Sequence, residues 1–171
     1  RPALDGYAEL KRRAGALDFL DLLLLARDLL RDHADVRAEL QERFARIFVD
    51  EFQDTDPLQA EILLLLASAD PSVTSWRDVV PAPGKLFLAG DPKQAIYRFR
   101  RADVGKYREV TELLASRGAR AVSLTASFRA VPALQRAVNA AFAPQMTGDA
   151  ATRQAAYVPL APVRDEEVRR P

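Results

Sequence analysis

Two adjacent carboxylates at the end of an apolar run are the residues of this sequence best suited to chemistry. The apolar residues 47–49 lead directly into Asp50 and Glu51. Three apolar residues without alternation predict a short strand buried on both faces, with the acids at its C-terminal end. Asp50 can hold Mg²⁺ through an oxygen or a bound water, and Glu51 can orient or deprotonate an attacking water. A strand that simply enters a solvated loop has the same pattern, so both interpretations remain open.

Polar side chains also follow two further apolar runs. Residues 85–89 lead into a Gly-Asp-Pro-Lys-Gln turn that carries Gln94, and residues 121–124 predict a third strand that leads towards Arg129. If the three strands are parallel, their C-terminal ends share one rim, which then holds two acids, an amide and an arginine. A metal-bound phosphate is the ligand that uses all of these groups. Hydrogen bonding within turns is the alternative for Gln53 and Gln94, and a surface position beside a helix is the alternative for Arg129.

A basic and aromatic segment follows the second turn. It contains Tyr97, Arg98, Phe99, Arg100 and Arg101 in succession. Ordinary core packing explains the two aromatic residues equally well, and a solvated basic turn explains the three arginines. These residues alone therefore do not indicate a ligand.

The helices that position these groups are predicted from periodicity and capping residues. The Leu-rich segment 17–30 predicts a helix buried on most sides, with Asp18 as N-cap and Asp21 in the first turn facing the positive end of the helix dipole. Connections long enough to carry a helix imply parallel strands, so the expected fold is α/β, with a parallel sheet flanked by helices. The other expected helices are 1–13, 35–44 with Asp35 as cap, 57–67 with Asp56 as cap and Pro57 at the first position, 103–117 with Asp103 as cap, and 132–142.

Composition sets limits on the kind of protein. The 171 residues are 49% hydrophobic and 29% charged, which predicts a soluble globular chain with a proper core. The net charge of +1 is too balanced to indicate nucleic-acid binding by itself. With no cysteine and one histidine, thiolate zinc sites and multi-histidine sites are excluded. No run reaches membrane-spanning length, and the start at Arg1 leads us to expect a piece of a longer protein.

Three segments together resemble motifs of the UvrD/Rep superfamily of DNA helicases. Residues 49–56, Val-Asp-Glu-Phe-Gln-Asp-Thr-Asp, resemble its Walker B segment. Residues 90–100, Gly-Asp-Pro-Lys-Gln-Ala-Ile-Tyr-Arg-Phe-Arg, look like its third motif, and Asp-Pro-Lys-Gln is most similar to the RecB/AddA branch of helicase–nucleases. Residues 124–129 are similar to the fourth motif, and the helix after Asp18 resembles the segment upstream of Walker B. Order and spacing agree over residues 17–142.

The resemblance implies a partial RecA-like P-loop NTPase fold and a set of roles in the hydrolysis of ATP with Mg²⁺. Asp50 would ligate the Mg²⁺ ion and Glu51 would activate the hydrolytic water. Gln53 would link the nucleotide site to the neighbouring motif, and Gln94 would sense the γ-phosphate.

The same resemblance implies contacts with the base of ATP and with DNA. Arg129 would act as an arginine finger, and Phe128 would stack near the adenine. Tyr97 and Phe99, with Arg100 beside them, would meet single-stranded DNA. An aromatic ring stacks on any base, which suits a motor that is indifferent to sequence.

The sequence also departs from the family pattern. Arg101 stands where the family commonly has glycine, which puts the local turn in doubt, and Ala126 and Ser127 replace a common Gln-Asn pair. No Gly-x-x-x-x-Gly-Lys-Ser/Thr phosphate loop occurs in the sequence. We therefore expect residues 1–121 to be the later part of a first RecA-like domain and residues 122–171 to be the start of a second.

The expected parent is a bacterial, cytoplasmic, nucleoid-associated 3′–5′ DNA helicase or translocase of recombinational repair, and the fragment alone is expected to be inactive. Its partners would be single-stranded and duplex DNA and a further subunit of a helicase–nuclease complex, with no membrane. Two alternatives remain: a scaffold protein of such a complex that does not hydrolyse ATP, and a simple DNA-binding module that uses residues 97–101. The second alternative leaves the carboxylates after the buried strand unexplained.

Overall fold

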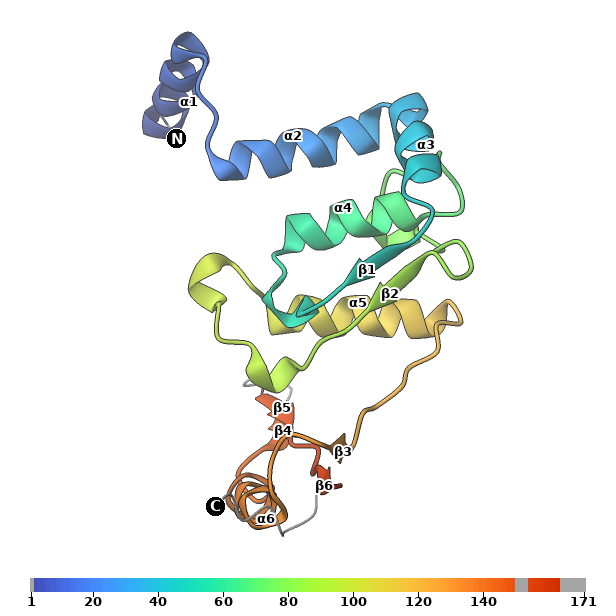
Figure 1. The fold of residues 1–171 in the computed structure, drawn as a ribbon. Helices are drawn as coiled ribbons and strands as arrows, with labels where there is room; N and C mark the ends of the chain where they lie inside the picture. Colours follow the sequence, from blue (N-terminus) through green and yellow to red (C-terminus); the bar gives the residue numbers. More distant parts are fainter. Residues whose placement is uncertain (1, 150–153, 164–171) are drawn as a thin grey trace, which may run out of the picture.

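The computed structural model describes residues 2–149 and 154–163, which form a mixed α/β structure (Figure 1). The described chain places most of its helices before residue 117 and most of its short strands after residue 125. The helices are α1 (Pro2–Ala14), α2 (Phe19–Asp32), α3 (Ala34–Arg43), α4 (Pro57–Ala67), α5 (Val104–Ser116) and α6 (Pro132–Phe142). The strands are β1 (Ile47–Val49), β2 (Leu86–Leu88), β3 (Ala126–Ser127), β4 (Thr147–Asp149), β5 (Gln154–Ala156) and β6 (Ala161–Pro162).

Side-chain caps begin three of the helices, as the sequence predicts. The Asp56 carboxylate accepts from the backbone N–H of Gln59 at 2.9 Å, and the Gln59 side chain accepts from the backbone N–H of Asp56 at 3.1 Å. This reciprocal pair satisfies two N–H groups that have no partner within the helix. Asp103 caps α5 by accepting from the backbone N–H of Gly105 at 2.8 Å.

The expectation that Asp35 caps the third helix is wrong. Helix α3 begins at Ala34, and Asp35 lies in its first turn. His33 alone joins α2 to α3: its N–H donates to the Leu29 carbonyl at 3.1 Å and its carbonyl accepts from Arg37 at 3.0 Å. A junction of one residue leaves no room for a separate cap, so α3 starts one residue earlier than its sequence indicates.

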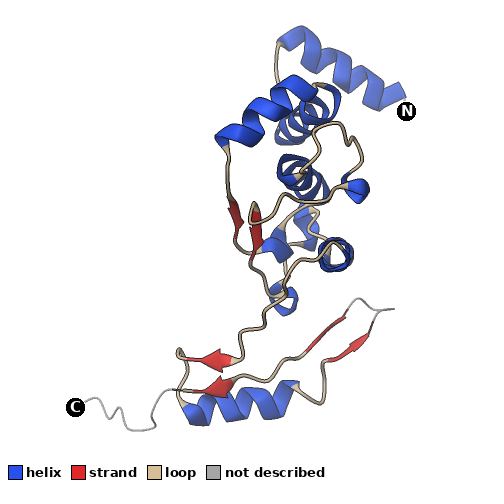
Figure 2. Cartoon of the chain, turned by 90° about the vertical axis from the view of Figure 1, so that its right-hand side faces the viewer, coloured by secondary structure: helices blue, strands red, loops and turns tan. Residues whose placement is uncertain are grey.

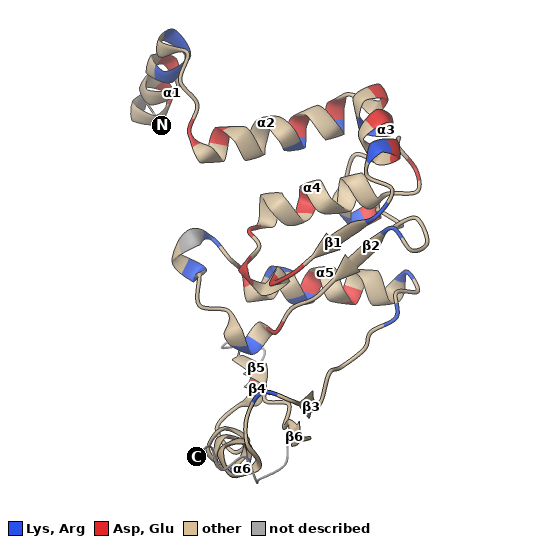
Figure 3. Ribbon diagram, in the orientation of Figure 1, with Lys and Arg blue, Asp and Glu red and all other residues tan. Residues whose placement is uncertain are grey.

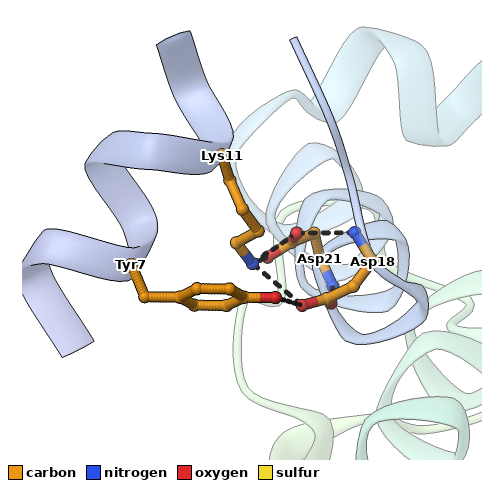
Figure 4. Close-up of polar contacts among 4 residues, drawn as sticks. All are labelled: Tyr7, Lys11, Asp18 and Asp21. Carbon is orange, nitrogen blue, oxygen red and sulfur yellow. Dashed lines mark hydrogen bonds and ion pairs between the residues drawn. The ribbon is translucent and has the colours of Figure 1, made fainter. Parts of the chain in front are cut away.

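A charged cluster fastens α1 to the start of α2 (Figure 4). The Lys11 ammonium donates to Asp18 at 2.9 Å and to both oxygens of Asp21, at 2.7 and 2.6 Å. Asp18 and Asp21 also form the capping box of α2, as the sequence predicts for Asp18. The hydrogen bonds from Lys11 to Asp21 and Asp18 raise the pKa of Lys11 to about 12. Lys11 is therefore charged throughout the physiological range.

Strands β1 and β2 are parallel, as expected, but only one face of their sheet is covered. They pair in the register Ile47↔Leu86, Phe48↔Phe87 and Val49↔Leu88. Val49, Leu86 and Leu88 pack against a core supplied largely by α4 and α5. Phe48 and Phe87 point the other way, 73% and 60% exposed, with ring centroids 5.8 Å apart.

The prediction of strands buried on both faces is therefore wrong for the described residues. Side chains alternate between the faces of a strand, so a two-stranded sheet needs a layer on each face to be buried on both. In Figure 2 the helices that pack against this sheet lie to one side of it.

The third expected strand does not join this sheet. Residues 121–124 are exposed and have no strand assignment. Strand β3 begins at Ala126, and it pairs in parallel with β6 in a separate sheet. The chain leaves α5 at Gly118 and runs away from β1 and β2 towards the C-terminal part (Figure 1). A strand pairs where backbone partners are available, and here β6 provides them.

The C-terminal part is built around α6 and two small sheets. Strands β4 and β5 are antiparallel, and Asn139 of α6 binds the segment before β6 by donating to the Leu160 carbonyl at 2.9 Å. Arg108 of α5 donates to the Gln154 carbonyl at 2.7 Å, which joins this part to the rest of the chain. Among the helices of residues 2–149 and 154–163, none has the length and apolar character needed to cross a membrane.

Candidate functional site

The two carboxylates after β1 lie on a tight backbone turn. Glu51 has φ 52° and ψ 41°, in the left-handed region that residues with a Cβ rarely adopt. Its N–H donates to the Asp50 carboxylate at 2.9 Å, and the N–H of Phe52 donates to the Ala89 carbonyl at 2.9 Å. The turn directs the chain from the end of β1 towards the end of β2. Both acids remain exposed, so their carboxylates are accessible to a ligand.

Gln53 connects the ends of the two strands. Its side chain is 1% exposed, and its amide nitrogen donates to the Glu51 carboxylate at 2.6 Å. Its amide oxygen accepts from the backbone N–H of Asp91 at 2.8 Å. The Gln53 amide thus uses its nitrogen and its oxygen to join residues that are 40 positions apart, which is the difference between 91 and 51. A buried amide with both ends satisfied holds its neighbours in one geometry.

Gly90 makes this close approach possible. A Cβ on Gly90 would lie 2.9 Å from the Gln53 amide oxygen and 3.1 Å from a ring carbon of Tyr107. The Tyr107 ring packs against Phe52 with centroids 5.6 Å apart, so neither neighbour has space to withdraw. Only a glycine lets the backbone after β2 pass this near to Gln53.

We expect Gly90→Ala to lower the free energy of unfolding by about 1–3 kcal/mol, the usual cost of an added methyl group in a packed site. Urea unfolding of the chain measures this difference. Gly6→Ala is the control, because a Cβ at Gly6 in α1 meets nothing within 4 Å. Equal unfolding midpoints for Gly90→Ala and the wild type would contradict the close packing at Gly90.

Asp91 gathers the polar groups of the second turn. Its carboxylate accepts from the Gln94 amide at 3.1 Å and pairs with the Lys93 ammonium at 3.0 Å. Burial alone would raise the pKa of Asp91, but the hydrogen bonds from Gln94 and Lys93 outweigh it, so the pKa is lowered. Stability from these bonds is therefore present above the ordinary pKa of 3.8 and is lost as pH falls through the lower folded value. Burial and the nearby charge of Asp91 raise the pKa of Tyr107.

The site therefore brings four of the predicted residues together. Asp50, Glu51 and Gln53 follow β1, and Gln94 is linked to them through Asp91. Sequence reasoning left Asp91 and Tyr107 out of the site. For Asp91, the signal was its position directly after the glycine that ends the strand. For Tyr107 no local signal exists, because its contact with Gly90 depends on how α5 packs.

Asp50 and Glu51 suit Mg²⁺ as part of a larger ligand set. The described residues contain no group of three or more His, Cys, Asp or Glu that could hold a metal by itself. Mg²⁺ is usually bound through one or two carboxylates, with water and substrate phosphates completing its coordination. Two exposed carboxylates at one turn fit that pattern, so Asp50 would supply a direct or water-mediated oxygen.

Two aromatic side chains lie on the loop after the second turn. The rings of Tyr97 and Phe99 are 5.8 Å apart, and Phe99 is 77% exposed. Core packing, the alternative for Phe99, is therefore excluded. The side chain of Arg100 lies outside the described part of the structure. Figure 3 shows acidic residues at the turn after β1 and basic residues on the segment between β2 and α5, so the two strand ends carry opposite charges.

Arg101 keeps the backbone conformation that glycine would favour. It has φ 73° and ψ 7°, and its N–H donates to the Arg98 carbonyl at 3.0 Å. The family turn is thus retained despite the substitution, at a cost in backbone strain.

We expect Arg101→Gly to raise the free energy of unfolding by up to about 1 kcal/mol, since glycine adopts this conformation without strain. Urea unfolding is again the measurement. Arg98→Gly is the matched control, because Arg98 does not have a positive φ and should gain nothing. A destabilised Arg101→Gly variant would show that the arginine side chain contributes more than its backbone costs.

Arg129 and Phe128 do not share the rim of the β1–β2 sheet. Both follow β3, which pairs with β6 in a different sheet, and Phe128 is exposed. The prediction of one continuous rim with two acids, an amide and an arginine is therefore wrong for the described structure. The arginine belongs to the C-terminal part, which carries it on a separate sheet.

Comparison with known proteins places the whole arrangement. The model of the UvrD/REP helicase N-terminal domain matches residues 1–114. Proteins named as ATP-dependent helicase/nuclease subunits of the AddA type are similar over most of the chain. The one from Natranaerobius thermophilus is 32% identical over 146 residues, which cover 84% of this chain and 11% of that protein.

Two further relatives with the same name agree. The protein from Desulfitobacterium hafniense is 34% identical over 180 residues, which cover 95% of this chain and 12% of that protein. The protein from Exiguobacterium sibiricum is 40% identical over 104 residues, which cover 59% of this chain and 8% of that protein. The chain thus spans between 8 and 12% of the length of these three relatives. The predicted AddA-like resemblance is confirmed.

Proposed function

The chain belongs to the UvrD/REP helicase family, and we propose that it is part of an ATP-dependent 3′–5′ DNA helicase or translocase of the AddA type. The parent would couple hydrolysis of Mg-ATP to movement on single-stranded DNA during recombinational repair. The relatives are named as one subunit of a helicase/nuclease, which suggests that the parent also has a partner protein. A motor that acts on bacterial DNA would work in the cytoplasm, at the nucleoid.

The bridge formed by Gln53 is the observation that best supports this proposal. It holds the Glu51 carboxylate and the backbone of Asp91 in one network, and Asp91 in turn holds the Gln94 amide. A carboxylate and an amide held at neighbouring strand ends suit a reaction in which one group handles water and the other contacts phosphate. A plain DNA-binding module has no use for such a network.

The residues of this edge would divide the work of hydrolysis. When bound, Mg²⁺ would neutralise phosphate charge and help to orient ATP. Asp50 would hold the metal through one carboxylate oxygen, while the other oxygen fixes the turn. Glu51 would orient water and accept its proton, and its hydrogen bond from Gln53 would keep the carboxylate in place. Gln94 would contact the terminal phosphate from a position set by Asp91.

The remaining predicted groups belong to the same proposal. Residues 1–121 would form the later part of a first RecA-like domain, and residues 122–171 would begin a second. Arg129 would neutralise charge on the leaving phosphates, with Phe128 near the adenine. Tyr97 and Phe99, with Arg100, would contact single-stranded DNA, for which the exposed Phe99 ring is well suited.

We expect the full-length parent to hydrolyse ATP faster when single-stranded DNA is added, and we expect residues 1–171 alone to show no turnover. The phosphate loop that this reaction requires does not occur in these residues. Steady-state ATPase assays of both proteins, with and without DNA, test the proposal. A folded parent without turnover would support the scaffold alternative, and helicase-like turnover by residues 1–171 would refute the expectation for the fragment.

A further inference from the structure

Lys93 lies between the network after β1 and β2 and the C-terminal part of the chain. Its ammonium is 3.0 Å from the Asp91 carboxylate and 5.9 Å from the centroid of the Tyr157 ring. Cations are attracted to aromatic faces within about 6 Å of the ring centroid. The Lys93 side chain is 21% exposed, so most of it is removed from solvent. One ammonium therefore contacts both parts of the molecule.

Tyr157 is firmly attached to the C-terminal part. Its hydroxyl donates to the Asn139 side chain of α6 at 2.8 Å, and its N–H donates to the Met146 carbonyl at 2.8 Å. Its ring stacks on Phe142 with centroids 6.3 Å apart. A movement of this part would therefore move the ring that Lys93 faces.

Asn139 extends the connection to the strand that precedes Arg129. Its amide nitrogen donates to the Leu160 carbonyl at 2.9 Å, immediately before β6. Strand β6 pairs with β3: Val163 donates to the Ser127 carbonyl at 3.0 Å, two residues before Arg129. A continuous set of contacts thus leads from Asp91 through Lys93 and Tyr157 to the segment that carries Arg129.

We propose that Lys93 is a positioning residue that couples Gln94 and its Asp91 partner to the C-terminal part through the Tyr157 ring. The inference rests on the function proposed above, and it assigns a role to a residue of the second turn that needs no contact with ATP. When the C-terminal part shifts, the Tyr157 ring shifts with it. Lys93 then changes its pull on Asp91, and the Gln94 amide, bound to the same carboxylate, is reoriented.

A double-mutant cycle in the full-length parent tests this coupling. We expect Lys93→Met to lower the kcat of DNA-stimulated ATP hydrolysis about tenfold, with KM for ATP unchanged within about twofold, since Lys93 acts through other residues. Lys93→Arg should retain most of the activity, because a guanidinium keeps the charge and also interacts with aromatic faces. Lys106→Met is the control: Lys106 packs over Trp76 and binds Glu109, away from Tyr157.

The Tyr157 variants identify the partner. In a Tyr157→Leu background the ring is gone, so Lys93→Met should cost at most about a further twofold. In a Tyr157→Phe background the ring remains, so Lys93→Met should cost its full factor. An active parent in which Lys93→Met costs as much without the ring as with it would overturn the inference alone. A wild-type parent without DNA-stimulated turnover would overturn the proposed function, and this inference with it.

Discussion

Replacing Glu51 with glutamine in the full-length parent should abolish most ATP hydrolysis. A positioned general base contributes about 10²–10⁴-fold to a rate, and glutamine cannot accept the proton from water. The kcat of the variant should fall by that factor with single-stranded DNA present. Because the amide oxygen of glutamine can still accept the hydrogen bond from Gln53, the site should keep its geometry.

Two measurements separate loss of chemistry from loss of structure. The unfolding free energy of Glu51→Gln should stay within about 0.5 kcal/mol of the wild type, as for most substitutions at exposed positions. Glu39→Gln, at an exposed position of α3, removes the same charge far from the turn and should leave kcat unchanged. If Glu51→Gln hydrolysed ATP at the wild-type rate, Glu51 would not be the base.

Replacing Gln53 with alanine should lower the free energy of unfolding by about 2–4 kcal/mol. The change leaves the backbone N–H of Asp91 without its partner, and an unsatisfied buried donor costs about 1–3 kcal/mol. The remainder comes from the cavity left by a side chain that is 1% exposed. Urea unfolding of the chain measures the loss.

Gln94→Ala is the matched control for Gln53→Ala. It removes an exposed amide from the same network, so its unfolding free energy should change by no more than about 0.5 kcal/mol. In the parent, however, both variants should lower ATP hydrolysis, because each breaks the connection between Glu51 and the terminal phosphate. If Gln53→Ala were as stable as Gln94→Ala, the buried bridge would not hold the two strand ends together.

Features set by neighbouring residues could be predicted from the sequence. The N-caps Asp18, Asp56 and Asp103 were predictable because a cap acts on an N–H two or three residues away. The parallel pairing of β1 and β2 followed from the length of the connection that carries α4. The acids after β1 and the amide after β2 were likewise expected at one edge of the sheet.

The exposure of side chains and the pairing of later strands depended on distant parts of the chain. Phe48 and Phe87 have the sequence of a buried strand, yet no layer of the described chain covers them. The third expected strand at 121–124 gave way to β3, because β6, some 35 residues further on, supplies its backbone partner.

The sequence by itself determined the chemistry available to this protein: the carboxylates, the amides and the strand ends that carry them. Only the tertiary structure decided how they connect. The left-handed turn at Glu51, the bridge from Gln53 to Asp91 and the position of Lys93 beside Tyr157 all join residues from different elements. Local propensity acts over a few residues, whereas these contacts form only when the whole core brings distant segments within hydrogen-bonding distance.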